Sequence, residues 1–330
     1  MLRPNNGILL TAAVVASIAA FAAFGQQPPK PPLIPQDETG TIFRSDTRIV
    51  VLHTTVVDKS GHLVTTLPQT AFTVYENGVT QPIRGFKRED VPVSMGLVVD
   101  NSGSMRDKRS KVETAALGLV KASNKDDEVF VVNFNDEAFL DNPHGKDFTS
   151  DVKEMEEALT RIDSRGGTAM RDAIRMSIDH LKEKAKKDKK VLVVVTDGND
   201  NSSTINLENL VKAAQQSEVI LYAIGILSEE ERREAKRAER ALGELAQATG
   251  GEAFFPKSID EVERLAQQVA RDIRNQYTIQ YSPTNQTMDG SFRQIKVAVN
   301  APGRPVARTR TGYYATEKGV QQQNKASAFK

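Results

Sequence analysis

The chain has 330 residues, 44 Lys and Arg against 43 Asp and Glu, and a formal net charge of +1. Its 39% hydrophobic content is ordinary for a folded globular protein and excludes a disordered chain, and at roughly 100 to 200 residues per domain its length predicts one large domain or two smaller ones. It contains no cysteine, which excludes a disulfide framework, thiolate zinc sites and thiol nucleophiles. The balanced charge provides no basic surface for a phosphate backbone, so we expect no nucleic-acid partner.

The N-terminal region has the pattern of an export signal. Arg3 precedes a mostly apolar stretch from Ile8 to Phe24, and the composition then turns abruptly to GQQPPKPPLIPQ. We therefore predict a signal peptide over residues 1–25, cleaved near Ala22 or Gly25, and an exported protein that is secreted, periplasmic or on the cell surface. An uncleaved anchor stays open, because the apolar run is just long enough to span a bilayer, and only in that case do we expect membrane attachment.

The Pro-rich linker predicted over residues 26–40 is followed by a β segment at 41–90, with the runs IVVLHTTVV and FTVYENG. A second β segment is predicted at 276–316, with YTIQYSP, FRQIKVAVN and VARTRTGYY, before a polar tail at 317–330 that we expect to be disordered. Each β segment is too small to be stable alone, so we predict that the two pair into one small β-sandwich.

Residues 91–275 show a different pattern, in which apolar strand runs alternate with helical stretches. The runs VSMGLVVD, EVFVVNF, VLVVVTD and VILYAIGI are nearly all apolar, as in parallel strands that are buried on both faces. Helices are predicted over 106–123, 151–162, 169–186, 207–217, 229–248 and 259–274. The fold class is therefore α/β: a doubly wound, mostly parallel, Rossmann-like sheet inserted into the small β-sandwich.

Oxygen-bearing side chains follow the predicted strands where ligands of open α/β sheets collect. The run VVDNSGSM places Asp100, Ser102 and Ser104 in one loop at a strand end. Thr168 follows two glycines at a helix start, where it is also a good N-cap residue, and Asp197 ends the run VVVTD. Hydroxyl and carboxylate oxygens are hard ligands that suit Mg²⁺, Mn²⁺ or Ca²⁺ and not zinc or copper.

These five positions resemble a known metal-binding pattern. Asp100, Ser102 and Ser104 are similar to the D-x-S-x-S motif of the von Willebrand factor type A (VWA) domain, and Thr168 and Asp197 match its separate threonine and second aspartate in the same chain order. The resemblance implies a metal-ion-dependent adhesion site (MIDAS) that holds Mg²⁺, or Mn²⁺ or Ca²⁺. It further implies that both serines ligate the ion directly, the threonine directly or through water, and the aspartates at least partly through water.

The resemblance covers about residues 91–275, and the flanking segments resemble a bacterial subgroup in which β segments bracket the VWA domain. It implies an exported, non-enzymatic binding or adhesion module whose protein partner presents an Asp or Glu carboxylate. By analogy, the helix over 259–274 would be a mobile element. Two other functions stay open: a Mg²⁺-dependent phosphoryl hydrolase or transferase, and a structural envelope protein with a vestigial site. Against catalysis, the four histidines show no paired spacing and no general base lies near Asp100 in the sequence.

Overall fold

A computed structural model describes residues 48–316, except 89, 123, 162 and 229–231. The predicted signal peptide (1–25), linker (26–40), the start of the first β segment and the C-terminal tail (317–330) lie outside the described residues. Within the described ranges, every helix is too short or too polar to cross a bilayer.

The centre of the α/β part is a six-stranded sheet with the strand order β10-β9-β8-β5-β6-β7. Its strands are β5 (Val93–Asp100), β6 (Glu128–Phe134), β7 (Ala138–Leu140), β8 (Lys189–Thr196), β9 (Val219–Gly225) and β10 (Ala253–Phe254). All neighbours pair in parallel except β7, which runs antiparallel to β6. Every residue of β5, β8 and β9 is buried, which explains their nearly continuous apolar sequences.

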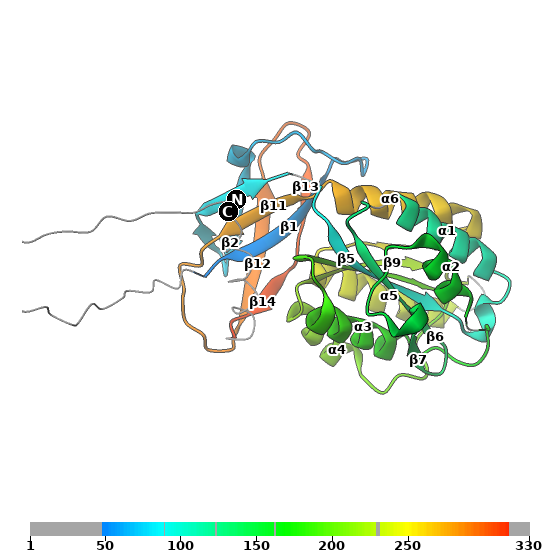
Figure 1. The fold of residues 1–330 in the computed structure, drawn as a ribbon. Helices are drawn as coiled ribbons and strands as arrows, with labels where there is room; N and C mark the ends of the chain where they lie inside the picture. The colour runs from blue at the N-terminus through cyan, green and yellow to red at the C-terminus, as the bar shows by residue number, and fades with distance from the viewer. Residues whose placement is uncertain (1–47, 89, 123, 162, 229–231, 317–330) are drawn as a thin grey trace, which may run out of the picture. The chain divides into compact units, whose positions relative to one another are not determined.

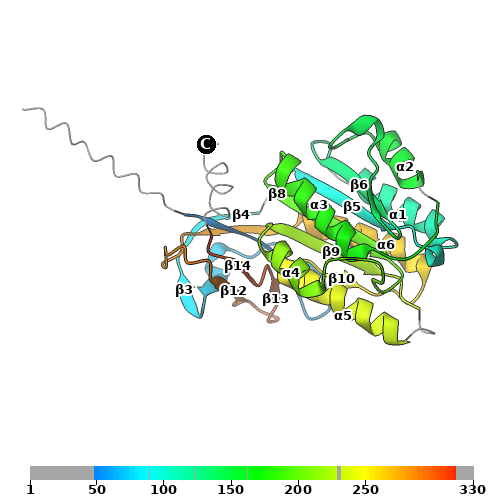
Figure 2. The ribbon, with the colours of Figure 1, turned by 90° about the horizontal axis from the view of Figure 1, so that it is seen from below.

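Helices of the described part of the chain cover the two faces of this sheet (Figures 1 and 2). They are α1 (Arg109–Lys121), α2 (Val152–Thr160), α3 (Met170–Lys184), α4 (Leu207–Gln215), α5 (Arg232–Thr249) and α6 (Val262–Arg274). Alternation along the strands decides which helices each residue meets: Leu97 and Val99 pack in one core with α1, α2 and α6, whereas Val98 packs in the other with α3, α4 and α5. The doubly wound prediction is confirmed.

The flanking β segments pair into two antiparallel four-stranded sheets, as predicted. One has the order β13 (Val306–Arg308), β1 (Val50–Val57), β11 (Tyr277–Tyr281), β4 (Ile83–Lys87). The other has the order β14 (Gly312–Tyr314), β12 (Phe292–Val299), β2 (Phe72–Glu76), β3 (Val79–Gln81). One apolar core joins the two sheets, and within it Phe72 of β2 lies 4.9 Å from Tyr277 of β11 between ring centroids.

Both connections between the α/β part and the sandwich leave from the same edge of the central sheet. Arg274 at the end of α6 donates to the Val91 carbonyl at 3.4 Å, just before β5, and forms an ion pair with Asp90 at 3.0 Å. It also forms an ion pair with Asp127, which precedes β6 and whose side chain is only 2% exposed. The chain therefore enters and leaves the α/β part at neighbouring points, at the edge opposite to the C-terminal ends of the parallel strands.

Candidate metal site

The carboxyl ends of β5 and β8 bring together two of the predicted ligands. These strands are parallel neighbours, and Val99 is in register with Val195. Asp100 is the last residue of β5, and Asp197 follows the last residue of β8 directly. Because parallel strands end at the same edge of a sheet, the two carboxylates lie there together although they are far apart in sequence.

Asp100 is buried and held by two donors. Its Oδ1 accepts the backbone N–H of Ser102 at 2.8 Å, and its Oδ2 accepts the hydroxyl of Thr196 at 2.5 Å. Only 1% of Asp100 is exposed, and this burial raises its pKa to about 6, assisted by the nearby charge of Asp197 and opposed by the hydrogen bonds from Thr196 and Ser102. A charged Asp100 therefore carries an unfavourable desolvation energy, which a bound cation would offset.

The two serines connect the loop after β5 to Asp197. Residues Gly103–Met105 form a single 3-10 turn, which brings the hydroxyls of Ser102 and Ser104 within 3.1 Å of each other. Ser104 donates in turn to Asp197 Oδ1 at 2.8 Å. The turn also explains why α1 starts at Arg109 and not at the predicted 106. We call Asp100, Ser102, Ser104 and Asp197 the oxygen cluster.

Lys108 occupies the other side of Asp197. Its ammonium forms an ion pair with Asp197 Oδ2, and the lysine side chain is 29% exposed whereas that of the aspartate is 1% exposed. A buried carboxylate without a counter-charge is costly, so Lys108 provides the positive charge that Asp197 needs in this state. Sequence reasoning missed this residue, because nothing in the run MRDKRS distinguishes it from a solvated surface lysine.

Thr168 lies at the same edge, but no hydrogen bond joins its side chain to the oxygen cluster among the described residues. Its hydroxyl oxygen is 3.9 Å from the position that a Cβ on Gly198 would take, so it faces the residue after Asp197. The prediction that Thr168 caps a helix is wrong. α3 begins two residues later, and its first amides donate elsewhere: Arg171 N–H to Asp200 at 2.7 Å and Asp172 N–H to Ser203 at 3.0 Å. The Thr168 hydroxyl is consequently not used in capping.

The two glycines before Thr168 allow its loop to approach its neighbours closely. Gly166 has a φ of +72°, and a Cβ there would lie 2.0 Å from Asp136 Oδ2. The Gly167 N–H donates to Asp136 Oδ1 at 2.7 Å, and the Gly166 carbonyl accepts from Gly103 N–H at 3.2 Å. Side chains at these two positions would clash with Asp136 and with the loop after β8, and so would push the Thr168 loop away from both.

The donor set fits a hard dication. Hydroxyl and carboxylate oxygens converge here on one sheet edge, and Asp100 and Asp197 provide the negative charge. Over the described part of the chain there is no group of three or more His, Cys, Asp or Glu side chains arranged to hold a metal ion. The oxygen cluster differs from such a site because half of its oxygen-bearing side chains are serine hydroxyls. Thr196, which sequence reasoning also missed, orients Asp100 from the strand that ends beside it.

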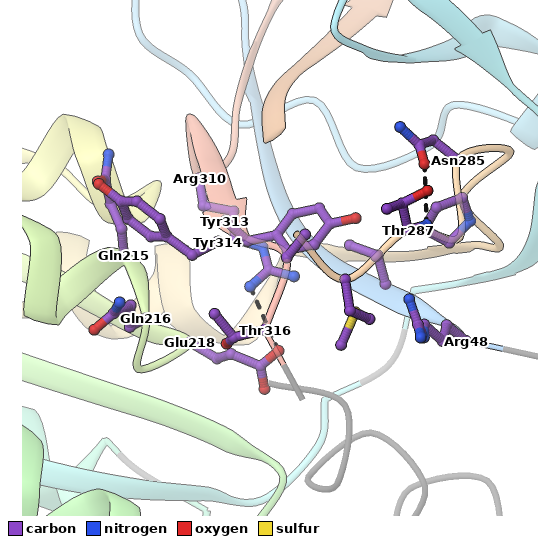
Figure 3. A pocket seen from close by; sticks show the side chains of 14 residues that line it. Arg48, Gln215, Gln216, Glu218, Asn285, Thr287, Arg310, Tyr313, Tyr314 and Thr316 are labelled. Atoms are coloured by element: carbon purple, nitrogen blue, oxygen red, sulfur yellow. Dashed lines mark hydrogen bonds and ion pairs between the residues drawn. The ribbon is translucent and has the colours of Figure 1, made fainter. Parts of the chain in front are cut away.

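A separate pocket of about 550 Å³, part of it open to solvent, lies where α4 meets the sandwich and shares no residue with the oxygen cluster. Figure 3 shows Arg310 there between Tyr313 and Glu218. The guanidinium carbon lies 5.7 Å from the centroid of the Tyr313 ring, and Nη1 is 3.4 Å from Glu218 Oε1. The Nε and Nη2 donors of Arg310 are buried without hydrogen-bond partners. This pocket contains no pair of groups suited to acid–base chemistry.

Comparison with known proteins identifies the α/β part. The family model described as the von Willebrand factor type A domain matches residues 95–268, just over half of the chain. Mouse integrin alpha-11 is 32% identical over 112 residues, which are 32% of this chain and 9% of the integrin. An uncharacterized protein of Borreliella burgdorferi is 27% identical over 215 residues, 64% of this chain and 60% of that protein. The chain thus spans less than two thirds of the length of each of these relatives.

Two solved structures are among the distant matches. The von Willebrand factor type A protein from Catenulispora acidiphila is 14% identical, covers 83% of this chain and 76% of its own, and has a TM-score of 0.48. The BatB protein from Bacteroides thetaiotaomicron is 20% identical over 55% of this chain and 98% of its own, with a TM-score of 0.42.

Proposed function

The chain belongs to the von Willebrand factor type A domain family, and from this premise we propose that it is an exported, non-enzymatic binding module that holds the acidic side chain of a protein partner through a divalent metal ion. In this proposal Ser102 and Ser104 ligate Mg²⁺ or Mn²⁺ directly, Thr168 directly or through water, and Asp100 and Asp197 at least partly through water. When bound, the ion would provide a positive centre with few anionic protein ligands, whose coordination a partner's Asp or Glu completes.

One observation carries the proposal. The hydroxyls of Ser102 and Ser104 and the carboxylate of Asp197 form a continuous series of contacts at 3.1 Å and 2.8 Å, although Ser104 and Asp197 are 93 residues apart in sequence. Ordinary turn serines would bond to their own loop instead. Here the Ser104 hydroxyl donates across the sheet edge to the carboxylate that follows a second strand, and the Ser102 hydroxyl contacts Ser104, an arrangement that supports a shared cation.

The surrounding residues support binding more than catalysis. Among the described residues, Thr196 donates to Asp100 and Lys108 is paired with Asp197. Neither is placed as a general base, which a phosphoryl hydrolase would need in addition to its metal. Export rests on the predicted signal at residues 1–25, and the segment similarity to an integrin supports a role in adhesion.

The test is isothermal titration calorimetry with Mg²⁺ and Mn²⁺ after treatment with EDTA. Asp100→Ala should weaken metal binding at least tenfold, since it removes a buried carboxylate of the site. Asp179→Asn is the control, because this aspartate is 43% exposed on α3 and paired with Arg175. Equal metal affinity in wild type and Asp100→Ala would refute the site, and turnover of generic phosphate esters that is abolished by Asp100→Asn would favour the hydrolase.

A further inference from the structure

A groove beside the oxygen cluster is lined mainly by charged side chains. It encloses about 710 Å³, including space open to solvent, between the loop after β8, the start of α3 and the first half of α5. We call it the arginine groove and define it by Arg171, Asn199, Asp200, Leu207, Arg237 and Arg240. Figure 2 shows α3, α4 and α5 along one face of the sheet, and α4 packs against both of the others.

The arginine groove keeps positive charge after its internal ion pairs are counted. Arg171 is neutralised by Asp200 at 2.8 Å, an aspartate whose side chain is only 5% exposed. Arg237 pairs with Glu234 at 3.1 Å, but its side chain is 69% exposed, and such surface pairs contribute little. Arg240 is exposed and makes no ion pair with any described residue. Arg237 and Arg240 are therefore available to an anionic ligand.

One backbone segment contributes to both the oxygen cluster and the arginine groove. The loop after β8 supplies Asp197 to the cluster and Asp200 to the groove, and the segment that carries Thr168 continues into α3, where Arg171 lines the groove. Hydrogen bonds fix these segments to each other: Thr168 N–H donates to Asn201 Oδ1 at 2.8 Å, and Arg171 N–H to Asp200 Oδ2 at 2.7 Å. Asp200 of the groove is three residues after Asp197 of the cluster, so one loop connects the two sites.

We propose that the arginine groove binds a second acidic residue of the partner, so that the partner presents an extended acidic segment and not a single carboxylate. This inference rests on the proposed function, because the first acid is the one at the metal. The occupant is a protein segment and not a nucleic acid. Asp200 and Glu234 interrupt the positive surface, which leaves isolated cations for separate carboxylates and no continuous track for a phosphate backbone.

The experiment measures fluorescence anisotropy of labelled peptides on the whole protein at 150 mM salt with Mg²⁺ or EDTA. The probes are hexaglutamate and a hexapeptide with one Glu among five Ser. Arg240→Glu should weaken hexaglutamate binding in Mg²⁺ about fivefold, because an exposed attraction becomes a repulsion, and should leave the single-Glu peptide unchanged. Arg264→Glu is the matched control: its side chain is 62% exposed on α6, which covers the opposite face of the sheet.

Equal hexaglutamate affinity in wild type and Arg240→Glu, or equal weakening by Arg264→Glu, overturns the inference. Tight binding of hexathymidylate with the same dependence on Arg240 also overturns it, in favour of a nucleic acid. Calorimetry with Mg²⁺ distinguishes failure of the arginine-groove inference from failure of the proposed metal site. If wild type binds no metal but binds hexaglutamate in EDTA and loses this with Arg240→Glu, the metal site fails and the arginine groove is supported.

Discussion

Replacing Lys108 by Met should have opposite effects on the stability of the metal-free protein and on its metal affinity. The Lys108 ammonium is the counter-charge of Asp197, whose side chain is 1% exposed. Loss of one partner from a fully buried ion pair costs about 3–5 kcal/mol, and the 29% exposure of the lysine reduces this to about 2 kcal/mol here. A bound dication would restore the missing charge, so the same energy should appear as a gain in metal affinity.

Since about 1.4 kcal/mol corresponds to a tenfold change, we expect Lys108→Met to bind Mg²⁺ about 30-fold more tightly than wild type. Urea denaturation in EDTA should show the corresponding loss of unfolding free energy, and calorimetry should show the gain in affinity. Lys108→Arg, which keeps the charge, should resemble wild type in both. Unchanged or weaker Mg²⁺ binding by Lys108→Met would show that the lysine and the metal do not share the Asp197 carboxylate.

Three further outcomes are expected. The pKa of Asp100 is raised from 3.8 to about 6, so the folded protein binds this proton more tightly than the unfolded chain does. In EDTA, the contribution of Asp100 to the unfolding free energy should therefore fall by about 3 kcal/mol as pH rises from about 4 to above 6. Urea titrations across this range should show this fall in wild type and not in Asp100→Asn. Gly166→Ala should lower the unfolding free energy by about 1–3 kcal/mol and weaken Mg²⁺ binding, because the φ of Gly166 is +72°. Its control in the same denaturation assay is Gly118→Ala in α1, which should raise the unfolding free energy by about 0.5–1 kcal/mol, because a Cβ there meets nothing within 4 Å. Arg310→Met should change thermal stability little, because the loss of the ion pair with Glu218, whose side chain is 30% exposed, is offset by the removal of a buried guanidinium with two unpartnered donors; a fall of several degrees in the melting temperature would contradict this.

The parts of the fold that were predictable are those in which burial controls the sequence. Residues 93–100 lie between two strands and under helices on both faces, so every position is apolar or small until Asp100. The short strands β4 and β7 were not predictable, because five and three residues at an edge carry no such pattern. The stretch VARTRTGYY has the pattern of one strand, but in the structure it divides into β13 and β14, which belong to different sheets.

For the candidate site, chain order was enough to propose the ligands but not their surroundings. Asp100 and Asp197 follow buried strands, and parallel pairing makes their proximity a direct consequence of the topology. The roles of Lys108, Thr196 and Asp200 depend on side-chain contacts between segments 29 to 96 residues apart, for which no local pattern exists. The cap supplied by Asp200 to α3 could not be inferred, because Asp200 is 29 residues away in sequence from Arg171, whose N–H it accepts, whereas Thr168 is only two residues before the helix.

The position of both chain connections at one edge of the central sheet has a mechanical consequence. A force applied at Asp100 would pull β5 along its own axis away from the opposite edge, where Val93 starts the strand and Arg274 fastens the end of α6. β5 has in-register neighbours on both sides, seven residue pairs with β6 and seven with β8. Tension along β5 would therefore load these ladders in shear, so that their hydrogen bonds must fail collectively and not one after another.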